Sequence, residues 1–202
     1  MTPHAIWYLG GAPCSGKSSV AEYLSRDYGL NYARLDDRLF AHIQSASVAS
    51  QPALASIRAA TCDQLWLIPP IAQARRTITA YIEEFPLHLA DIADMGPLLL
   101  EGAALLPCLV APVLVAPGQA FYLLPTPAFQ QQYYSLRTWT AEVVRDCSDP
   151  AQAYANWMRR DEIFGRWVRQ NARHHGLAAL MVDGTHDIEA TAALVARHFG
   201  LR

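Results

Sequence analysis

Lysine is almost absent from this chain. Its 202 residues include sixteen strongly basic side chains, and Lys17 is the only one of them that is not an arginine. Arginine presents a rigid planar fork, whereas lysine carries a compact charge on a flexible stem. One lysine in a chain that otherwise uses arginine therefore indicates a position that needs a compact positive charge on a long, flexible side chain.

The chain also lacks a basic excess and a recognisable cysteine pattern. The net charge is −2, so no positive field is available for a nucleic-acid backbone. The four cysteines, which show neither paired nor metal-type spacing, are Cys14, Cys62, Cys108 and Cys147. They are interpreted as free thiols in a reducing cytoplasm, and no nucleic-acid partner is expected.

No segment has the pattern of a signal peptide or a membrane span. The first residues lack the basic start and apolar core of a secretory leader. Residues 98–124 are strongly apolar, but Glu101 and three prolines interrupt them and Pro125 follows directly, which favours buried strands over a transmembrane helix. We therefore expect a cytoplasmic protein with no membrane partner, and the oligomeric state stays open.

What is present is a phosphate-binding motif around the single lysine. Residues 11–18 read GAPCSGKS, which fits G-x-x-x-x-G-K-[ST], the P-loop that cradles nucleotide phosphates. An apolar run at 5–9 precedes the motif, and an amphipathic pattern at 18–28 follows it and ends at Gly29. Strand, glycine loop and helix form the setting in which this motif acts. The sequence therefore predicts binding of a nucleoside triphosphate, taken as ATP, with Mg²⁺.

Each position of the loop has a predicted role. Glycines allow a close approach, backbone N–H groups form a concave nest, and the helix N-terminus adds partial positive charge. Lys17 is expected to reach the terminal phosphates, and the hydroxyl of Ser18 is placed to bind Mg²⁺. The residues expected to bind the nucleotide are Gly11, Ala12, Pro13, Cys14, Ser15, Gly16, Lys17, Ser18 and Ser19.

Strand and helix patterns alternate along the rest of the chain. Strands are predicted at 5–9, 31–35, 97–102, 120–124 and 178–182, and helices at 18–28, 38–95 with proline interruptions, 103–110, 127–144, 150–174 and 188–199. Such alternation predicts an α/β domain with a parallel sheet covered by helices on both faces. Ligands of these sheets bind at the carboxyl ends of the strands, where the P-loop, Asp36, Glu101 and Asp183 fall.

With this motif and order, the chain resembles the P-loop small-molecule kinases, which include adenylate, shikimate, gluconate and uridine kinases and chloramphenicol phosphotransferase. The resemblance implies a single P-loop kinase-like domain over 1–202 with five parallel strands in the order 2-3-1-4-5. It also implies a helical acceptor-site insertion at 38–95 after strand two and a lid region at 125–160. The signatures of the shikimate, gluconate and thymidylate kinases are not found, so the acceptor stays open.

The resemblance assigns roles to two acidic residues, each with an alternative. Asp36 matches the acidic residue after strand two that binds or deprotonates an acceptor hydroxyl; alternatively it caps the helix that follows, although Asp37 suits that position better. Glu101 matches the acidic end of strand three that holds Mg²⁺; alternatively it is a carboxylate satisfied by hydrogen bonds to a neighbouring loop.

The resemblance also implies that lid arginines neutralise the transferring phosphoryl group. Candidates are Arg137, Arg159 and Arg160, of which Arg137 and Arg160 are taken as catalytic together with Lys17 and Asp36. The alternative for the arginines is a solvated face paired with Asp161 or Glu162.

The predicted function is an ATP-dependent transfer of the γ-phosphate to a hydroxyl or phosphate of a small metabolite. Two alternatives stay open, a nucleotide-hydrolysing switch without an acceptor and a kinase acting on a nucleic-acid end. The long insertion speaks against the switch, because a switch needs no acceptor chamber, and the net charge of −2 speaks against the nucleic-acid kinase.

Overall fold

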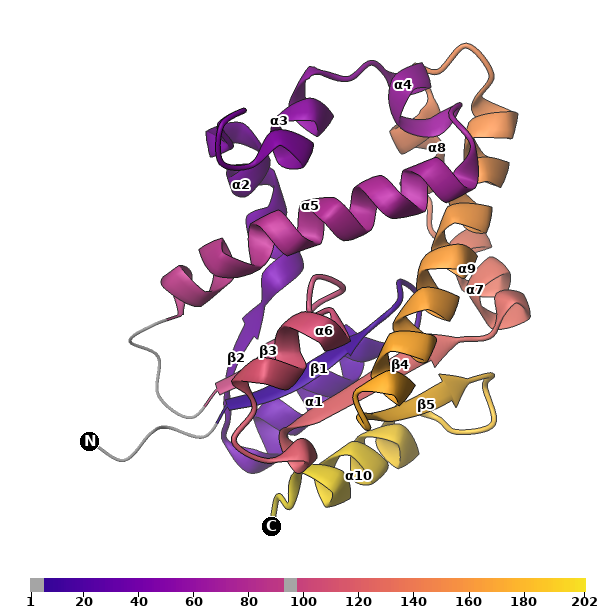
Figure 1. Ribbon diagram of the computed structural model, residues 1–202. Coiled ribbons are helices and arrows are strands. Elements are labelled where there is room, and N and C mark those ends of the chain that lie inside the picture. The colour runs from indigo at the N-terminus through magenta and orange to yellow at the C-terminus, as the bar shows by residue number, and fades with distance from the viewer. Residues whose placement is uncertain (1–5, 93–97) are drawn as a thin grey trace.

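The core of the protein is a five-stranded parallel sheet (Figure 1). The computed structural model describes residues 6–92 and 98–202; Ala5, Met95 and Pro97, which fall in predicted elements, lie outside them. The strands are β1 Ile6–Gly11, β2 Asn31–Arg34, β3 Leu98–Glu101, β4 Ala120–Pro125 and β5 Ala178–Val182. Their order is β2-β3-β1-β4-β5. The predicted α/β class, the parallel sheet and the strand order are confirmed.

Helices cover both faces of this sheet (Figure 1). The α-helices are α1 Lys17–Tyr28, α2 Leu39–Ser45, α3 Pro52–Ala59, α4 Cys62–Trp66, α5 Pro70–Asp91, α6 Pro107–Val110, α7 Pro127–Ser135, α8 Thr140–Val144, α9 Pro150–His174 and α10 Ile188–Phe199. Three short 3₁₀ turns are η1 Leu35–Arg38, η2 Ala111–Val113 and η3 Pro117–Gln119. Over the residues described, none of these helices combines the length and the apolar character needed to cross a bilayer.

Two apolar cores flank the sheet because successive strand side chains point to opposite faces. On one face, Leu9 and Leu123 pack with Val20 of α1 and Val195 of α10. The strand residues of the other face, which include Tyr8 and Tyr122, pack against α6, α9 and the end of α5. Every strand of the central part is therefore buried on both sides, as parallel sheets require.

The segment between β2 and β3 is helical, as predicted, and contains α2 to α5. Pro52 and Pro70 each stand at the first residue of a helix, where the missing N–H costs nothing. Pro86 was expected to interrupt the segment, but α5 continues through it to Asp91. The buried side chains of Phe85 and His88 on either side hold the helix in place, and this packing offsets the lost hydrogen bond.

Two helical predictions after β4 have different outcomes. The segment 127–144 is broken into α7 and α8, and the break at 136–139 places Arg137 in a turn. The long helix α9 begins at Pro150 as predicted, and the Asp149 side chain accepts a hydrogen bond from the backbone N–H of Gln152 at 3.0 Å. Asp149 therefore caps the helix as its sequence position indicates.

Two of the four cysteines are bonded to each other. Cys62, the first residue of α4, and Cys147, between α8 and α9, form a disulfide with Cα atoms 4.9 Å apart. The prediction of free thiols is therefore wrong for this pair and holds for Cys14 and Cys108. Because the paired cysteines are 85 positions apart, no local spacing reveals their contact. The predicted cytoplasmic location rested in part on four free thiols, and two of them are bonded here, so the location remains a prediction.

Reduction of this disulfide, or the Cys62→Ser substitution, is expected to lower the melting temperature. In the chain-entropy description, closing a loop of 85 residues stabilises the folded state by about 4.5 kcal/mol, which corresponds to roughly 10–15 °C for a domain of this size. Thermal denaturation with and without reductant measures the effect. Cys108→Ser, which leaves the disulfide intact, is the matched control and should melt as wild type does under both conditions. Four titratable thiols in denatured, unreduced protein would contradict the pairing.

Candidate functional site

The backbone of residues 11–18 forms a tight turn between β1 and α1. Gly11 has φ 137° and Gly16 has φ 77°, both in the region that disfavours side chains. At Gly11 a Cβ atom would lie 1.9 Å from the carbonyl oxygen of Leu123, so no larger residue fits against β4. Cys14 is the one non-glycine residue with positive φ among those the structure describes, at 60°. The two motif glycines therefore have a steric reason to be where they are.

The backbone N–H groups of this turn are free to bind a ligand. Within the described residues, the N–H groups of positions 14–19 donate no hydrogen bond, whereas the N–H of Ala12 bonds Leu123 and that of Val20 bonds Gly16. Unpaired N–H groups at a helix N-terminus form an anion-binding nest. A cluster of such donors inside a cavity calls for acceptor oxygens such as those of phosphate.

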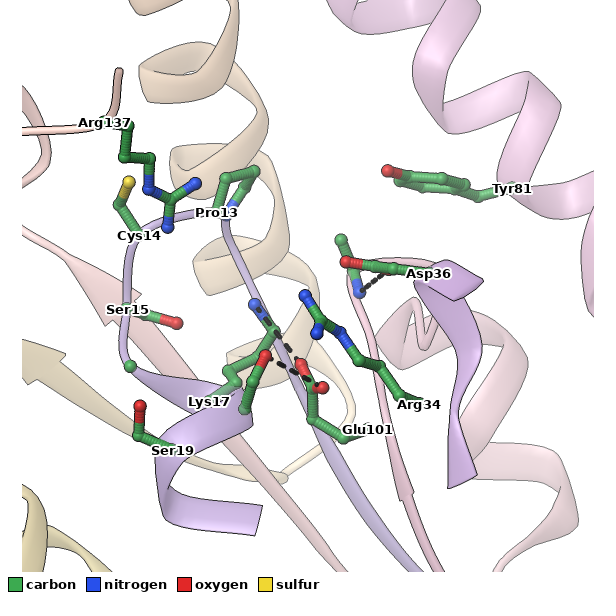
Figure 2. A pocket seen from close by; sticks show the side chains of 13 residues that line it. Pro13, Cys14, Ser15, Lys17, Ser19, Arg34, Asp36, Tyr81, Glu101 and Arg137 are labelled. Atoms are coloured by element: carbon green, nitrogen blue, oxygen red, sulfur yellow. Dashed lines mark hydrogen bonds and ion pairs between the residues drawn. The ribbon is translucent and has the colours of Figure 1, made fainter. Parts of the chain in front are cut away.

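A cavity of about 280 Å³ opens in front of this turn (Figure 2). Its lining comes from five places in the chain: the P-loop with the start of α1, the end of β2 with η1, the end of β3, one residue of α5 and one residue of the α7–α8 turn. The lining residues are Pro13, Cys14, Ser15, Gly16, Lys17, Ser18, Ser19, Arg34, Asp36, Tyr81, Glu101, Ala103 and Arg137.

Lys17 points into this cavity from the first residue of α1 (Figure 2). Its Nζ donates a hydrogen bond of 2.9 Å to the carbonyl oxygen of Ala12 and lies 4.0 Å from Glu101 Oε1. The residue is only 6% exposed, so its charge is held in a poorly solvated place. A buried ammonium group beside free N–H donors forms a strongly electropositive cradle.

Glu101 lies on the floor of the same cavity and is held by two hydroxyl groups. Its Oε2 accepts hydrogen bonds from Ser18 at 3.1 Å and from Tyr32 at 2.9 Å. Burial raises the pKa of this carboxyl above its usual range, while the Lys17 charge and both hydrogen bonds act in the opposite direction. The side-chain oxygens of Ser18 and Glu101 are adjacent and are of the kind that Mg²⁺ prefers. These residues therefore fit a magnesium ion between them and a bound phosphate.

Asp36 and Tyr81 lie together on the wall opposite the P-loop (Figure 2). Asp36 belongs to η1, and its Oδ1 accepts a hydrogen bond of 3.4 Å from the backbone N–H of Ala103. Tyr81 extends from α5; burial and the negative charge of Asp36 raise the pKa of its phenol. The predicted capping role of Asp37 is wrong, because neither η1 nor α2 has a side-chain cap and Asp37 instead pairs with Arg34.

Arg137 reaches the cavity from the turn between α7 and α8, beside Cys14 (Figure 2). Its guanidinium carbon lies 5.0 Å from the ring centre of Tyr134 and 5.4 Å from that of Trp139. Burial raises the pKa of the Cys14 thiol to about 11, although the Arg137 charge partly opposes this rise. The thiol is therefore protonated at neutral pH, which favours a passive loop residue over a redox-sensitive one.

Arg160, the other lid arginine taken as catalytic, does not line this cavity. Its Nε lies 2.6 Å from Asp161 Oδ1, its Nη1 donates to Thr77 at 3.1 Å, and its guanidinium covers the Trp66 ring at 5.2 Å. These contacts join α9 to the insertion. Arg159 is turned to the surface and pairs with Glu162. Of the three candidate arginines, Arg137 alone is brought to the P-loop.

A second cavity of about 500 Å³ lies on the other side of the P-loop and shares Cys14, Ser15, Gly16, Ser19 and Arg137 with the first. Its remaining walls come from α7, the β5–α10 connection and the start of α10, with Phe129, Tyr133, Gly184, His186 and Ile188 among them. The rings of Phe129 and Tyr133 stack with centres 4.2 Å apart. The polar cavity at the P-loop thus adjoins a larger chamber with aromatic walls.

Sequence reasoning missed Arg34, which lines the first cavity, and Tyr32, which lies outside its lining. Arg34 lines it from the last position of β2, and Tyr32 two residues earlier binds Glu101. In the sheet, Arg34 is directly paired with Glu101. Ligands of parallel sheets bind at the carboxyl ends of the strands, and Arg34 is the last residue of β2, so the argument that selected Asp36 would also have selected Arg34. Asp183 at the end of β5 lines neither cavity, and its carboxylate accepts hydrogen bonds from Thr185.

Comparison with known proteins gives a fold and no family. No protein-family model matches the sequence, and no curated protein matches it either. Among solved structures, the chain is similar to a crystal structure from Chloroflexus aurantiacus that is described as a "putative kinase". The two chains are 13% identical with a TM-score of 0.50, and the match covers 96% of this chain and 98% of the other. At this identity the likeness shows a shared α/β fold.

Proposed function

We propose that this protein is an ATP-dependent phosphotransferase that moves the γ-phosphate to a hydroxyl or phosphate of a small metabolite. The observation that carries the proposal is one cavity with two unlike walls. One wall holds Lys17 and the free N–H groups of the P-loop; the other holds Asp36 and Tyr81. A donor and an acceptor bound against these walls would meet inside the cavity. The name of the solved neighbour, "putative kinase", agrees with this reading.

The nucleotide would bind across both cavities. The triphosphate fits the cradle, where N–H groups, the helix N-terminus and Lys17 offset its charge. The base and ribose fit the larger chamber, where the stacked Phe129 and Tyr133 give an apolar wall. Ser18 and Glu101 would hold Mg²⁺, which neutralises charge on the phosphate oxygens when bound. The identity of the base as adenine is part of the proposal.

The chain's own groups have distinct parts in the transfer. Asp36 would accept the proton of the acceptor hydroxyl, because one of its oxygens is held by Ala103 and the other faces the cavity. Lys17 would leave the carbonyl of Ala12 for the terminal phosphates. Arg137 would stabilise the charge on the phosphoryl group from the side of the lid. Arg160 would not contact phosphate; it would support the site indirectly, by holding α9 against α5 through its hydrogen bond to Thr77.

The size of the cavity favours a small acceptor. A volume of about 280 Å³ is at the lower end for small-molecule sites, and much of it would be taken by phosphate. A switch without an acceptor does not explain a wall built from β2, η1 and α5 opposite the nucleotide. A nucleic-acid end would need a basic track outside the cavity, which a net charge of −2 does not favour.

The proposal is tested by a transfer screen with γ-labelled ATP. Hydroxyl-bearing metabolites, nucleosides and nucleoside monophosphates are offered as acceptors in the presence of Mg²⁺. Transfer of label to at least one of them, abolished in Lys17→Ala protein, is the expected result. ATP hydrolysis that no acceptor stimulates would favour the switch. Label transferred to oligonucleotide ends alone would favour the nucleic-acid kinase.

The Glu101→Gln substitution is expected to weaken the Mg²⁺ dependence of turnover more than it weakens metal-free ATP binding. The amide keeps the size of the side chain and an oxygen that accepts from Tyr32, but it loses the charge that would attract the ion. Magnesium titrations of turnover, compared with calorimetry of ATP in the presence of chelator, measure the two effects. Equal losses in both would mean that Glu101 organises the loop instead of the metal.

The same variant has an internal control in its pH dependence. Burial raises the pKa of Glu101 in the folded protein above its value in the unfolded chain. The ligand-free fold is therefore expected to lose stability as pH rises from the unfolded-state pKa to the folded-state pKa of this carboxyl group. The Gln variant has no such ionisation, so without nucleotide it is expected to be at least as stable as wild type at neutral and higher pH. A large loss of stability in the apo variant would show that the charge itself supports the fold.

A further inference from the structure

A second group of chemically active side chains lies between α2 and α5. It consists of His42 on α2 and of Glu84 and His88 on α5, and all three are buried, with exposed fractions of 8%, 1% and 1%. Glu84 and His88 are one helical turn apart, so they share a face of α5. None of the three lines the cavity at the P-loop. The proposed phosphoryl transfer therefore does not account for this His42–Glu84–His88 cluster.

The distances within the cluster match those around a metal ion. His42 Nδ1 lies 3.0 Å and His88 Nε2 lies 3.3 Å from the same atom, Glu84 Oε1. One donor atom from each side chain lies within 4.8 Å of the other two. Ligand atoms bound about 2.1 Å from a tetrahedral zinc ion are about 3.4 Å from one another. The two nitrogen-to-oxygen distances are thus close to ligand spacing, and the two nitrogens lie within 4.8 Å of each other.

His88 is buried without any hydrogen bond. Neither of its ring nitrogens has a hydrogen-bond partner among the residues described, and the 3.3 Å contact of Nε2 with Glu84 does not have hydrogen-bond geometry. Burying an imidazole in this state costs free energy, because its interactions with water are lost and not replaced. A cation bound to Nε2 would supply the missing partner. This unsatisfied side chain points to a ligand independently of the distances.

The other nitrogen of His42 is held by a carboxylate. Its Nε2 lies 3.3 Å from Asp91 Oδ2, and Asp91 lies 4.0 Å from the Nε of Arg38. A carboxylate on one ring nitrogen fixes the proton there and leaves a lone pair on the other, the arrangement found behind metal-binding histidines. The lone pair of His42 Nδ1 would then face a carboxylate oxygen at 3.0 Å. Either a second proton on His42 or a metal cation must then lie between these two atoms.

We propose that His42 Nδ1, Glu84 Oε1 and His88 Nε2 bind a divalent transition-metal ion, with zinc as the best match. Two imidazoles and one carboxylate form a set of ligands that suits zinc, whereas Mg²⁺ prefers oxygen ligands alone. A water molecule would complete the four-coordinate shell. Asp91 is a positioning residue that orients His42. The site is separate from the proposed nucleotide site and does not depend on it.

Such an ion would fasten α2 to α5. The turn η1, which carries Asp36, runs directly into α2, while α5 carries Tyr81. The metal would therefore fix the two elements that form the wall opposite the P-loop. It would do so without contacting the nucleotide, so its effect on the fold can be measured with no substrate present.

The test uses the full chain, stripped of metal with chelator and titrated with zinc chloride in the absence of nucleotide. One zinc ion per chain and a higher melting temperature with zinc are the expected results. Substitution of Co²⁺ should give the visible absorption of a tetrahedral site. A wild-type protein that binds none of Zn²⁺, Co²⁺, Ni²⁺ or Cu²⁺ with one-to-one stoichiometry would overturn the proposal, and His42 would then be the proton-sharing partner of two carboxylates.

Variants locate the ion. His88→Gln and His42→Ala are expected to lose at least 100-fold in zinc affinity, and Asp91→Asn about 10- to 100-fold, the range found for outer-shell partners. His174→Ala, which removes an exposed imidazole outside the cluster, and Lys17→Ala should bind zinc as wild type does. Where His88→Gln does not fold, Glu84→Gln takes its place. Unchanged binding in the folded cluster variants would place the ion elsewhere and overturn the assignment.

Discussion

The Lys17→Ala protein is expected to fold and to show no rise in melting temperature with ATP. Lys17 carries the only side-chain ammonium group in the sequence, and its Nζ lies between the carbonyl of Ala12 and Glu101 in the lining of the cavity. Ligand at 100 times its dissociation constant stabilises a protein by about 2.7 kcal/mol, or roughly 5–10 °C at this size. Loss of the charge that would meet the terminal phosphates should remove most of this increment.

Two variants control for effects of Lys17 on the fold. Its removal also takes a positive charge from Glu101, so the apo melting temperature of Lys17→Ala must be measured alongside that of wild type. Lys17→Arg keeps the charge but replaces a flexible stem by a planar fork, and it should fail as well. Thermal shift and calorimetry with ATP and Mg²⁺ are the measurements. An ATP-induced rise equal to that of wild type in Lys17→Ala would mean that the P-loop is not a nucleotide site.

The Asp36→Asn protein is expected to bind ATP within a few-fold of wild type and to lose most acceptor phosphorylation. General-base assistance typically contributes 10²- to 10⁴-fold to a rate, which sets the expected loss. Asparagine can still accept the hydrogen bond that the N–H of Ala103 donates, so the local backbone should not change. The side chain lies on the wall opposite the P-loop, and among the described residues it makes no hydrogen bond to the P-loop, which is why nucleotide affinity should survive.

Asp37→Asn is the matched control for this experiment. Asp37 is the neighbouring aspartate, exposed and paired only with Arg34 at 3.7 Å on the surface, so its replacement should leave both binding and transfer nearly unchanged. Calorimetry gives nucleotide affinity, and labelled transfer gives the rate once an acceptor is identified. Full transfer activity in Asp36→Asn would remove Asp36 from the mechanism. Hydrolysis without any acceptor, insensitive to Asp36→Asn, would make the regulatory switch the better proposal.

Local chemistry in the sequence determined the phosphate cradle and most of the elements around it. Gly11 and Gly16 permit positive φ angles that other residues disfavour, and this preference is local. The close approach of Gly11 to Leu123, by contrast, depends on the pairing of β1 with β4. Helix ends were predictable for the same reason: Gly29 and Gly200 end α1 and α10 in left-handed conformation, and Asp149 caps α9. Alternation of strands and helices then implies the parallel sheet.

Packing between distant segments determined the direction of Arg160 and the continuation of α5 through Pro86, which sequence patterns did not predict. Helical spacing places Arg159 and Arg160 on different faces, but the packing of α9 on α5 directs Arg160 to Thr77 and Asp161 instead of the cavity. Pro86 stays inside α5 because its neighbours are buried, a tertiary contribution that local propensity does not include.

Long-range pairings belong to the same class. The Cys62–Cys147 bond joins residues 85 positions apart, and the spacing of Glu84 and His88 gives no sign that His42 lies against them. Both depend on how helices pack, since a helix repeat specifies which residues share a face and not which face of another helix meets it. The sequence alone therefore determined the P-loop turn, and the tertiary structure decided which distant side chains surround it and which form the second cluster.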